Sequence, residues 1–381
     1  MSLAERHADA LVQRLVSALE QPNALPHGYR LLDWDVDHGI SMVLVKADQH
    51  LLVEASARND SAGCLAQTAR FNLTARDPFG EERQLSGEKR AVVDAVVALL
   101  SAGEKGLPQV ARQSAVGSRA QIRTISVQRA LVREGRGQYY LNPYVGCSIG
   151  CSFCFVEDQA DLARGLEGLP RVPWGRWVDV KSNLPDVLRA EVKRLPPGIV
   201  RMSPIVTDPY QPLERRHRIT RSCLEILLAH GFYPCVLTRA ARIREDIELL
   251  ARFERAWVGL SVPTNDDKVR HAFEPGADSI EARLECLAEC RGAGLKTFAV
   301  VQPTLPQDPQ RLVELLAPLI DVVRIDRMHC IERVRHIYES TGNLDATTDA
   351  WFEGAQAELA AGFVERGVRL HPLDDLRELF A

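Results

Sequence analysis

The stretch Asn142-Pro-Tyr-Val-Gly-Cys-Ser-Ile-Gly-Cys-Ser-Phe-Cys-Phe155 carries three cysteines, Cys147, Cys151 and Cys154, in the spacing C-x3-C-x2-C. Three thiolates this close together can bind one inorganic centre. A [4Fe–4S] cluster takes four cysteine ligands, but the next cysteine along the chain is Cys223. The spacing therefore predicts a [4Fe–4S] cluster with one open iron, which indicates reactive chemistry rather than a structural clip.

The alternatives to a cluster are a structural zinc site and a disulfide framework. A structural zinc site needs four ligands, usually in two pairs, and only Glu157 or Asp158 could complete the set here. A disulfide framework is disfavoured because the chain is long and its nine cysteines are an odd number. Residues 1–20 are charged and lack the apolar segment of a secretion signal. We therefore expect a reduced, cytoplasmic protein.

The charge along the chain is unevenly distributed. The 381 residues have a net charge of -4, but residues 108–270 carry 25 Lys and Arg against 17 Asp and Glu. Residues 1–107 and 271–381 are acidic. The basic centre favours an anionic ligand, with solvated helix surfaces as the alternative. No apolar run is long enough to span a membrane, so no membrane partner is expected.

The first part of the chain, residues 1–107, is expected to be a small α+β domain with a possible role in substrate recognition. Apolar periodicity predicts helices near both of its ends and short strands between them. Cys64 is isolated and reads as a structural thiol. Residues 108–137 are rich in Arg, Gly and Ser, and we expect a basic linker there. The predicted helices cover 3–20 and 88–100, and the predicted strands cover 40–45, 51–55 and 71–75.

From residue 138 to 330 the pattern alternates between strands and helices. This alternation predicts parallel βαβ units, and six strands give a partial, TIM-like (β/α)6 barrel. The expected strands are 139–145, 199–206, 234–238, 256–262, 297–302 and 321–326, and the expected helices are 220–230, 244–253, 279–292 and 308–317. The tail, 331–381, is expected to be a helical extension that covers an open edge or the barrel mouth.

Further motifs follow the cysteines in order. They are Pro173-Trp-Gly-Arg176, Val180-Lys-Ser-Asn183, Val206-Thr-Asp-Pro-Tyr-Gln-Pro212, Arg218-Ile-Thr-Arg-Ser-Cys-Leu-Glu225 and Val236-Leu-Thr-Arg239. With the cysteine loop, this set resembles the radical S-adenosylmethionine (SAM) superfamily, in its spore photoproduct lyase-like (DNA-repair-photolyase-like) branch. The resemblance covers about residues 138–340. It implies an enzyme that cleaves SAM reductively at a [4Fe–4S] cluster to a 5′-deoxyadenosyl radical, which abstracts hydrogen from a substrate.

The resemblance also implies where SAM binds. Phe153 matches the aromatic position next to adenine. Thr207 and Asp208 match the position that receives the SAM amino group, although Asp208 could instead cap the turn before a proline. Arg239 matches a basic residue facing the SAM carboxylate, a task that suits a guanidinium. Ser261 is placed for the ribose or the carboxylate.

Three further residues end the last two predicted strands. Gln302 ends strand five, and Arg324 and Asp326 end strand six. They are candidates for the rim of the active site, or they are ordinary polar residues of that rim.

The chain departs from the resemblance at the residue that returns a hydrogen atom to the product radical. Spore photoproduct lyases carry a cysteine near the position that Ile205 occupies here. Dimer repair by that route is therefore not expected. Substitute hydrogen donors could be Cys330 or one of the tyrosines Tyr139, Tyr140, Tyr144 and Tyr210. The remaining cysteines Cys235, Cys286 and Cys290 are expected to be core residues.

The function predicted for the chain is therefore that of a radical SAM enzyme acting on a peptide or natural-product intermediate. The alternative is lesion repair or base modification in a nucleic acid. A more remote alternative is a non-catalytic metal-binding module. By family resemblance, the electron donor is expected to be a flavodoxin or a ferredoxin.

Overall fold

A computed structural model describes the chain in ranges separated by gaps. These ranges are 3–35, 40–57, 65–76, 85–105, 120–135, 137–157, 160, 164, 169–203, 206–329 and 331–381. Cys64, Asp158, Ile205 and Cys330 lie outside them, so the hypotheses about these residues stay predictions. The chain forms two compact units. One comprises Met1–Arg119, Val132–Tyr140 and Val156–Pro173, and the other Ala120–Leu131, Leu141–Phe155 and Trp174–Ala381.

The first unit contains an antiparallel sheet with the strand order β1-β2-β3-β5-β4. Leucines of α1 and valines of α2 pack with the apolar residues of these strands into one buried core. Ser86 caps α2 by accepting a hydrogen bond from the Lys89 N–H. The two predicted helices are confirmed as α1 (Leu3–Leu19) and α2 (Gly87–Glu104), and the three predicted strands as β2 (Ile40–Lys46), β3 (Gln49–Ala57) and β5 (Phe71–Arg76). The other strands of this unit are β1 Arg30–Asp35, β4 Ala66–Gln67, β7 Val132–Gly135 and β8 Gln138–Tyr140, of which β1, β4 and β7 were not predicted.

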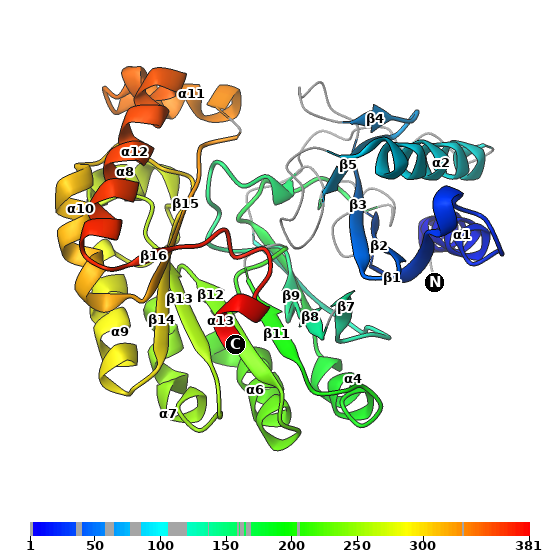
Figure 1. The fold of residues 1–381 in the computed structure, drawn as a ribbon, viewed down its shortest axis with the longest axis horizontal. Helices are drawn as coiled ribbons and strands as arrows, with labels where there is room; N and C mark the ends of the chain where they lie inside the picture. The colour runs from blue at the N-terminus through cyan, green and yellow to red at the C-terminus, as the bar shows by residue number, and fades with distance from the viewer. Residues whose placement is uncertain are drawn as a thin grey trace. The chain divides into compact units, whose positions relative to one another are not determined.

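The second unit is built on a parallel sheet in which β11 to β16 follow one another in chain order (Figure 1). Helices alternate with these strands, as the sequence predicted. The strands are β11 Ile199–Met202, β12 Tyr233–Thr238, β13 Trp257–Ser261, β14 Lys296–Val301, β15 Val322–Ile325 and β16 Arg369–Leu370. The helices are α4 Leu184–Glu191, α5 Glu214–His217, α6 Ile219–Ala229, α7 Ile247–Leu250, α8 Asp267–Phe273, α9 Ile280–Gly292, α10 Pro309–Leu316, α11 Ile331–Ser340, α12 Asp349–Glu365 and α13 Arg377–Phe380.

The beginning of the barrel region differs from the prediction. The single strand expected over 139–145 is two short strands, β8 and β9 (Tyr144–Val145). Pro143 stands between them and has no N–H to donate to a continuous ladder. β9 instead pairs antiparallel with β10 (Trp177–Lys181). The expected linker also contains β6 (Gln121–Ile125), which pairs parallel with β10.

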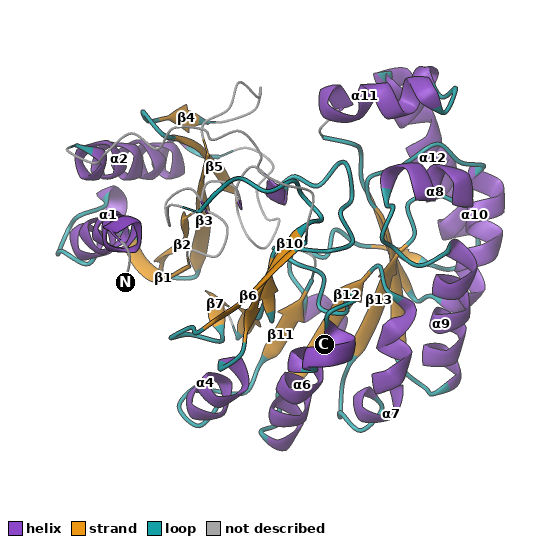
Figure 2. Ribbon diagram, turned by 180° about the vertical axis from the view of Figure 1, so that it is seen from behind, coloured by secondary structure: helices purple, strands orange, loops and turns teal. Residues whose placement is uncertain are grey.

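One face of the parallel sheet is covered by helices such as α6 and α9, as Figure 2 shows, and the other face has two zones. Alternate residues of a strand point to the same face. On β13, Trp257, Gly259 and Ser261 therefore share a face. The apolar residue lies at the start of the strand and the polar one at its end. An added methyl group at Gly259 would lie 2.2 Å from the Phe298 ring, so glycine lets the two neighbouring strands pack.

The apolar zone, which we call the floor, is covered by the end of the chain. Leu373, Leu376, Leu379 and Phe380 pack against residues at the starts of β11 to β15. The Trp257 indole N–H donates to the Leu379 carbonyl at 3.1 Å. The tail thus does two things. The strand β16 pairs with the edge strand β15, whereas only helical segments were expected to cover an edge, and the helix α13 covers the floor; the sequence predicted neither.

Candidate functional site

The cysteine loop follows β9 and depends on glycines for its path. Gly146 and Gly150 have φ angles of 79° and 65°, in the left-handed region that disfavours other residues. An added Cβ at Gly150 would lie 3.1 Å from Cα of Gly175, so the loop and the 174–176 turn are in backbone contact. Gly276 donates its N–H to the Ile149 carbonyl at 3.0 Å. These two close backbone approaches therefore hold the loop in place.

Polar side chains after β11 hold the same loop. Gln211 is fully buried and accepts a hydrogen bond from the Ser148 N–H at 2.9 Å. Its amide nitrogen donates to the Thr207 hydroxyl at 2.8 Å. Thr207 in turn donates to the Gly146 carbonyl at 2.7 Å. Thr207 therefore donates its hydroxyl proton to the backbone of the cysteine loop and helps to hold that loop in shape. Thr207 was predicted at a strand end, as a residue that receives the SAM amino group.

The three cysteines lie together: Cys147 and Cys151 are buried in one cluster, and the partly buried Cys154 packs against it. Burial raises the pKa of Cys147 to about 12 and also raises the pKa of Cys151, so bare thiolates would be costly there. A metal centre that replaces the protons removes this cost. Within the described ranges, no three His, Cys, Asp or Glu residues could hold one metal ion together.

Asp208 is a buried junction between β11 and β12. Its carboxylate accepts hydrogen bonds from the Tyr210 N–H at 2.9 Å, the Thr238 hydroxyl at 2.5 Å and the Arg239 N–H at 2.8 Å. Burial raises its pKa, and these hydrogen bonds oppose that shift. The residue holds the Arg239 backbone in place.

Arg239 belongs to a buried charge network. Its Nε donates to Glu274 at 2.6 Å, and the other Glu274 oxygen accepts from Arg283 at 2.8 Å. Burial opposes ionisation of Glu274, but Arg283 and Arg239 together lower its pKa, so it stays charged. Two guanidinium groups thus share one carboxylate. The network carries one excess positive charge close to Cys151, whose pKa Arg239 lowers.

The face of Arg239 that is not bound to Glu274 lies over the Phe153 ring, 5.6 Å from its centroid. The Arg239 Nη2 also donates to the Gln302 carbonyl at 3.3 Å, while its Nη1 makes no hydrogen bond within the described chain. The structure thus brings Phe153, Arg239 and Gln302 together. The Arg239 Nη1 can still donate hydrogen bonds to a ligand.

Three buried polar atoms near these residues have no partner in the described ranges. They are the Ser261 hydroxyl, the Trp174 indole nitrogen and the Tyr338 hydroxyl. Trp174 and Tyr338 pack in the same cluster as the cysteines. Unsatisfied buried donors are costly and rare. Together with three thiols and an excess positive charge, they fit an anionic iron–sulfur centre and a polar ligand such as SAM.

The remaining predicted rim residues lie at the end of β15. Gln302 donates to Asp326 at 3.0 Å, and Arg324 donates to the same oxygen at 3.2 Å. Burial opposes ionisation, but hydrogen bonds from His329 and from the Arg327 N–H lower the pKa of Asp326 to about 2. Asp326 is therefore a fixed anion, linked through Gln302 to Arg239.

The four tyrosines that are candidate hydrogen donors are all buried. The Tyr210 hydroxyl is buried and donates to Asp246 at 2.9 Å, and the Tyr144 hydroxyl donates to Glu214. Burial raises the pKa of both phenols. Tyr139 and Tyr140 lie on β8 of the first unit and are buried there. The hydrogen-donor hypothesis stays a prediction for all four.

The other predicted core cysteines are buried. Cys235 packs in the floor, and Cys286 and Cys290 lie one turn apart on the buried side of α9.

Several residues of this site were not identified from sequence. Gln211 and Trp174 lie inside quoted motifs, so the motifs were the signal that could have found them. Glu274 and Arg283 follow α8 and begin α9, outside any motif. Tyr338 lies in the tail, where only a helix was expected.

Comparison with known families identifies the central part of the chain. Residues 141–316 match the model of the Radical SAM superfamily. This match confirms the prediction of a radical SAM superfamily domain in this part of the chain, and that superfamily implies the predicted cofactors, a [4Fe–4S] cluster and SAM.

Curated relatives match the same part of the chain. An uncharacterised protein of Methanocaldococcus jannaschii is 28% identical over 169 residues, which cover 44% of this chain and 61% of that protein. An uncharacterised protein of Mycobacterium tuberculosis is 31% identical over 176 residues, 45% and 50% of the two chains. A protein of Pseudomonas phage M6 named radical SAM Nalpha-GlyT isomerase is 29% identical over 181 residues, 46% and 36%. The chain spans about half the length of the curated relatives it matches.

Among solved structures, a spore photoproduct lyase mutant with dinucleoside spore photoproduct is similar, with a TM-score of 0.47 and 15% identity. The similarity covers 65% of this chain and 80% of that one. The methyltransferase TsrM from Kitasatospora setae has a TM-score of 0.36 and 15% identity, covering 50% and 36%. No helix within the described ranges is long and apolar enough to cross a membrane.

Proposed function

The chain carries a radical SAM superfamily domain, and from this premise we propose that it is a radical SAM enzyme whose cofactors bind at the C-terminal ends of β11 to β15. The observation that carries the proposal is the clustering of Cys147, Cys151 and Cys154 beside a charge network in which two guanidinium groups share one carboxylate. The finer assignment of the sheet as a six-unit partial barrel is part of the same proposal.

Each group has a defined task in this proposal. Cys147, Cys151 and Cys154 hold the cluster. When bound, these cofactors would supply a one-electron reductive cleavage of SAM into methionine and a 5′-deoxyadenosyl radical that abstracts hydrogen. Arg239, held by Glu274, orients its free donors toward the SAM carboxylate. Ser261 offers a buried hydroxyl that no group of the described residues satisfies.

Other residues position these groups. Thr207 and Gln211 fix the cysteine loop through its backbone, and Asp208 fixes the start of the Arg239 segment. Phe153 covers one side of the Arg239 guanidinium and excludes water from it. A reductant such as a flavodoxin or ferredoxin has to deliver the electron, as the family requires.

The experiment is anaerobic reconstitution of the full chain with iron and sulfide. We expect about four irons per chain, a reduced cluster whose EPR spectrum changes when SAM is added, and 5′-deoxyadenosine after reduction. Ser261→Ala should retain the iron and bind SAM more weakly. Full iron loading with no spectral response to SAM would contradict the proposal.

For the substrate, we propose a peptide or peptide-like intermediate. Support comes from a pocket beside Asp326 whose charged lining groups already pair with each other, so that it suits a neutral ligand.

A nucleic acid is the second candidate, and exposed arginines favour it. Arg215, Arg216 and Arg218 are exposed and have no ion-pair partner in the described ranges. Their segment adjoins the cysteine loop, because Glu214 accepts a hydrogen bond from Tyr144. Cations near the reactive centre attract phosphates. If this candidate is right, a single-stranded oligonucleotide should bind with a steep salt dependence that Arg215→Glu and Arg216→Glu reduce. Arg244→Glu, on a surface paired with acids, is the control.

A further inference from the structure

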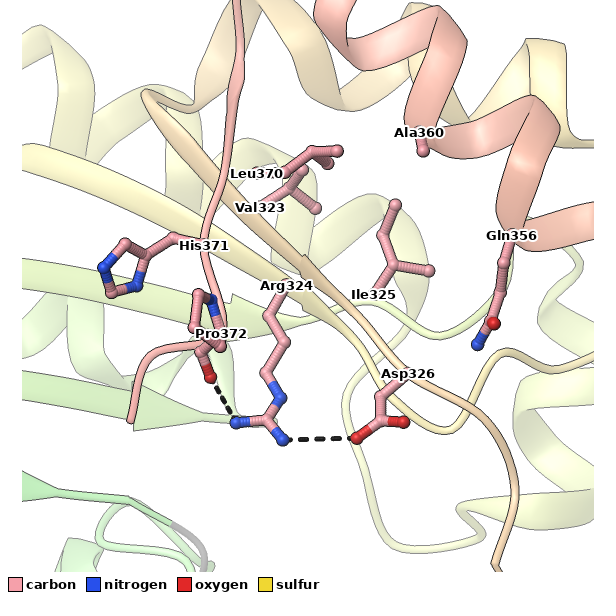
Figure 3. Close-up of a pocket in the computed structure, with 9 residues that line it drawn as sticks. All are labelled: Val323, Arg324, Ile325, Asp326, Gln356, Ala360, Leu370, His371 and Pro372. Carbon is pink, nitrogen blue, oxygen red and sulfur yellow. Dashed lines mark hydrogen bonds and ion pairs between the residues drawn. The ribbon is translucent and has the colours of Figure 1, made fainter. Parts of the chain in front are cut away.

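A pocket of about 390 Å³ opens at the edge of the parallel sheet, between β15, β16 and α12. Its walls combine apolar residues with a small number of polar groups (Figure 3). The residues that matter for the argument are Ile325, Asp326, Gln356, Ala360 and Leu370. The pocket lies at the C-terminal end of β15, the end at which parallel α/β sheets bind their ligands.

The pocket is connected to the candidate cofactor site by direct hydrogen bonds. Asp326 accepts from Gln302, and the Gln302 carbonyl accepts from Arg239. A ligand held in the pocket would therefore lie two residues away from the guanidinium that we assign to SAM.

The edge of β15 is only partly covered. β16 pairs with it at Val322 and Val323, and the last hydrogen bond runs from the His371 N–H to the Val323 carbonyl at 3.0 Å. Pro372 follows, and the chain turns away. Since alternate residues of a parallel strand face alternate edges, the N–H and C=O of Ile325 face this open edge. Neither group makes a hydrogen bond at that edge within the described ranges.

Gln356 supplies a second unpaired amide. Its side chain extends from α12 toward the end of β15 (Figure 3) and makes no hydrogen bond to the described residues. Like the Ile325 backbone, it offers one donor and one acceptor group. Two amide-type pairs at the mouth of an otherwise apolar pocket match a ligand that presents amides itself.

The charges of the pocket favour a neutral ligand over a phosphate. The Arg324 guanidinium is paired with Asp326 at 3.2 Å and with Asp374 at 3.3 Å, and it also donates to the Pro372 carbonyl. No cation of the lining is therefore left for an anion.

We propose that this pocket binds the main chain of a peptide substrate in an extended conformation, as an added strand along the open edge of β15. Such strand addition gains affinity from main-chain hydrogen bonds and specificity from alternate side chains. Here the peptide would pair with Ile325 and Gln356, and one of its side chains would enter the space between Ala360 and Leu370. This inference names the substrate class of the proposed enzyme, and so it rests on the proposed function.

The experiment uses the full chain reconstituted with its cluster. A random heptapeptide library is panned on it anaerobically, and the enriched peptides are synthesised with a fluorophore for anisotropy. We expect peptides that bind wild type and lose at least about tenfold in affinity to Ala360→Trp, which fills the pocket. Ala361→Trp is the matched control, because Ala361 is exposed on the same helix. Gln356→Leu should weaken binding about fivefold, the worth of one neutral hydrogen bond.

N-methylation of the bound peptide tests the strand geometry. Methyl groups at alternate residues should abolish binding, and those at the intervening residues should be tolerated. Thermal unfolding of each variant checks that it folds. The proposal is overturned if no peptide is enriched, if the enriched peptides bind both tryptophan variants equally, or if a ten-nucleotide single strand displaces them competitively. Iron content and the EPR response to SAM, measured on the same wild-type sample, show separately whether the proposed function fails.

Discussion

The two ends of one sheet face are built on opposite principles. At the strand starts, Trp257 and Phe298 are buried against Leu379 and Phe380, and their one polar group, the Trp257 indole N–H, is satisfied. At the strand ends, Ser261 keeps a buried hydroxyl without a partner in the described chain. The polar group of the floor is thus satisfied, whereas the rim retains a buried hydroxyl that no described residue satisfies.

This contrast explains how the rim can carry a costly site. Buried unpaired donors and an excess charge each cost stability. Apolar burial in the floor, at about 25 cal/mol per Å², offsets such costs within the same sheet. Residues at the strand starts therefore contribute mainly to stability, and residues at the strand ends mainly to the site.

The largest expected effect comes from replacing one cysteine of the rim and one cysteine of the floor by alanine and comparing the two variants. Cys151→Ala should lower the iron content of reconstituted protein to near background and abolish 5′-deoxyadenosine formation, because a cluster ligand is lost. Cys235→Ala, in the floor, should keep both and cost about 1 kcal/mol of unfolding free energy. Iron analysis and urea unfolding measure the two outcomes. Equal iron contents in the two variants would refute the separation.

The second expected effect tests the charge network of the rim. Glu274→Gln keeps the shape of the side chain but leaves Arg239 and Arg283 buried without a carboxylate. We expect a loss of about 3–5 kcal/mol in unfolding free energy, together with weaker SAM binding at unchanged iron content. Glu289→Gln is the control, since its pair with Arg244 is exposed and worth less than about 1 kcal/mol. A Glu274→Gln variant as stable as the control would contradict the network.

The sequence predicted the elements of this sheet well, because their signals are local. Apolar runs and glycine caps gave β12 to β15 and α6, α9 and α10 close to their observed bounds. The cysteine spacing and the strand-end positions of Arg239, Ser261 and Gln302 were likewise readable, since strand ends in such sheets share one edge.

The features that the sequence did not predict depend mainly on contacts between segments that are distant along the chain. Glu274, which directly follows α8, becomes part of the site only because it accepts a hydrogen bond from Arg239, which directly follows β12, and no spacing encodes that contact. Leu379 and Phe380 cover the floor because the tail folds back over the starts of the strands. Periodicity along the sequence does not determine where such a tail packs. The break at Pro143 was visible in the sequence, but the strand was expected to continue through it.

The third prediction removes the cover of the floor. Phe380→Ala should cost about 3 kcal/mol of unfolding free energy, as expected for a buried aromatic side chain, because it packs against Tyr233 and its neighbours. Val364→Ala, an exposed apolar residue on α12, should change stability by less than about 0.5 kcal/mol. Below the unfolding transition, both variants should load iron fully. Loss of iron in Phe380→Ala while it remains folded would show that the floor and rim are coupled.

The smallest expected effect is the pH dependence of the C-terminal segment. Burial lowers the pKa of His371, and Arg369 acts in the same direction, although Glu378 and Asp374 oppose the shift. The imidazole accepts the Leu373 N–H at 2.8 Å, so its neutral form belongs to the folded state. The unfolded chain therefore takes up a proton near pH 6.5 while folded His371 does not. By linkage, this residue lowers the unfolding free energy as the pH falls below that value and has no effect above it.

The size of this effect is bounded at about 1.4 kcal/mol per pH unit for one proton, and the opposing Glu378 should keep it smaller. Urea unfolding of wild type and His371→Gln at pH 7.5 and pH 5.5 isolates it, because every other titrating group is common to both chains. Wild type should lose more stability between the two pH values than the variant does. Identical losses would mean that the folded floor tolerates a charged His371, and that the tail holds the sheet through Leu379 and Phe380 alone.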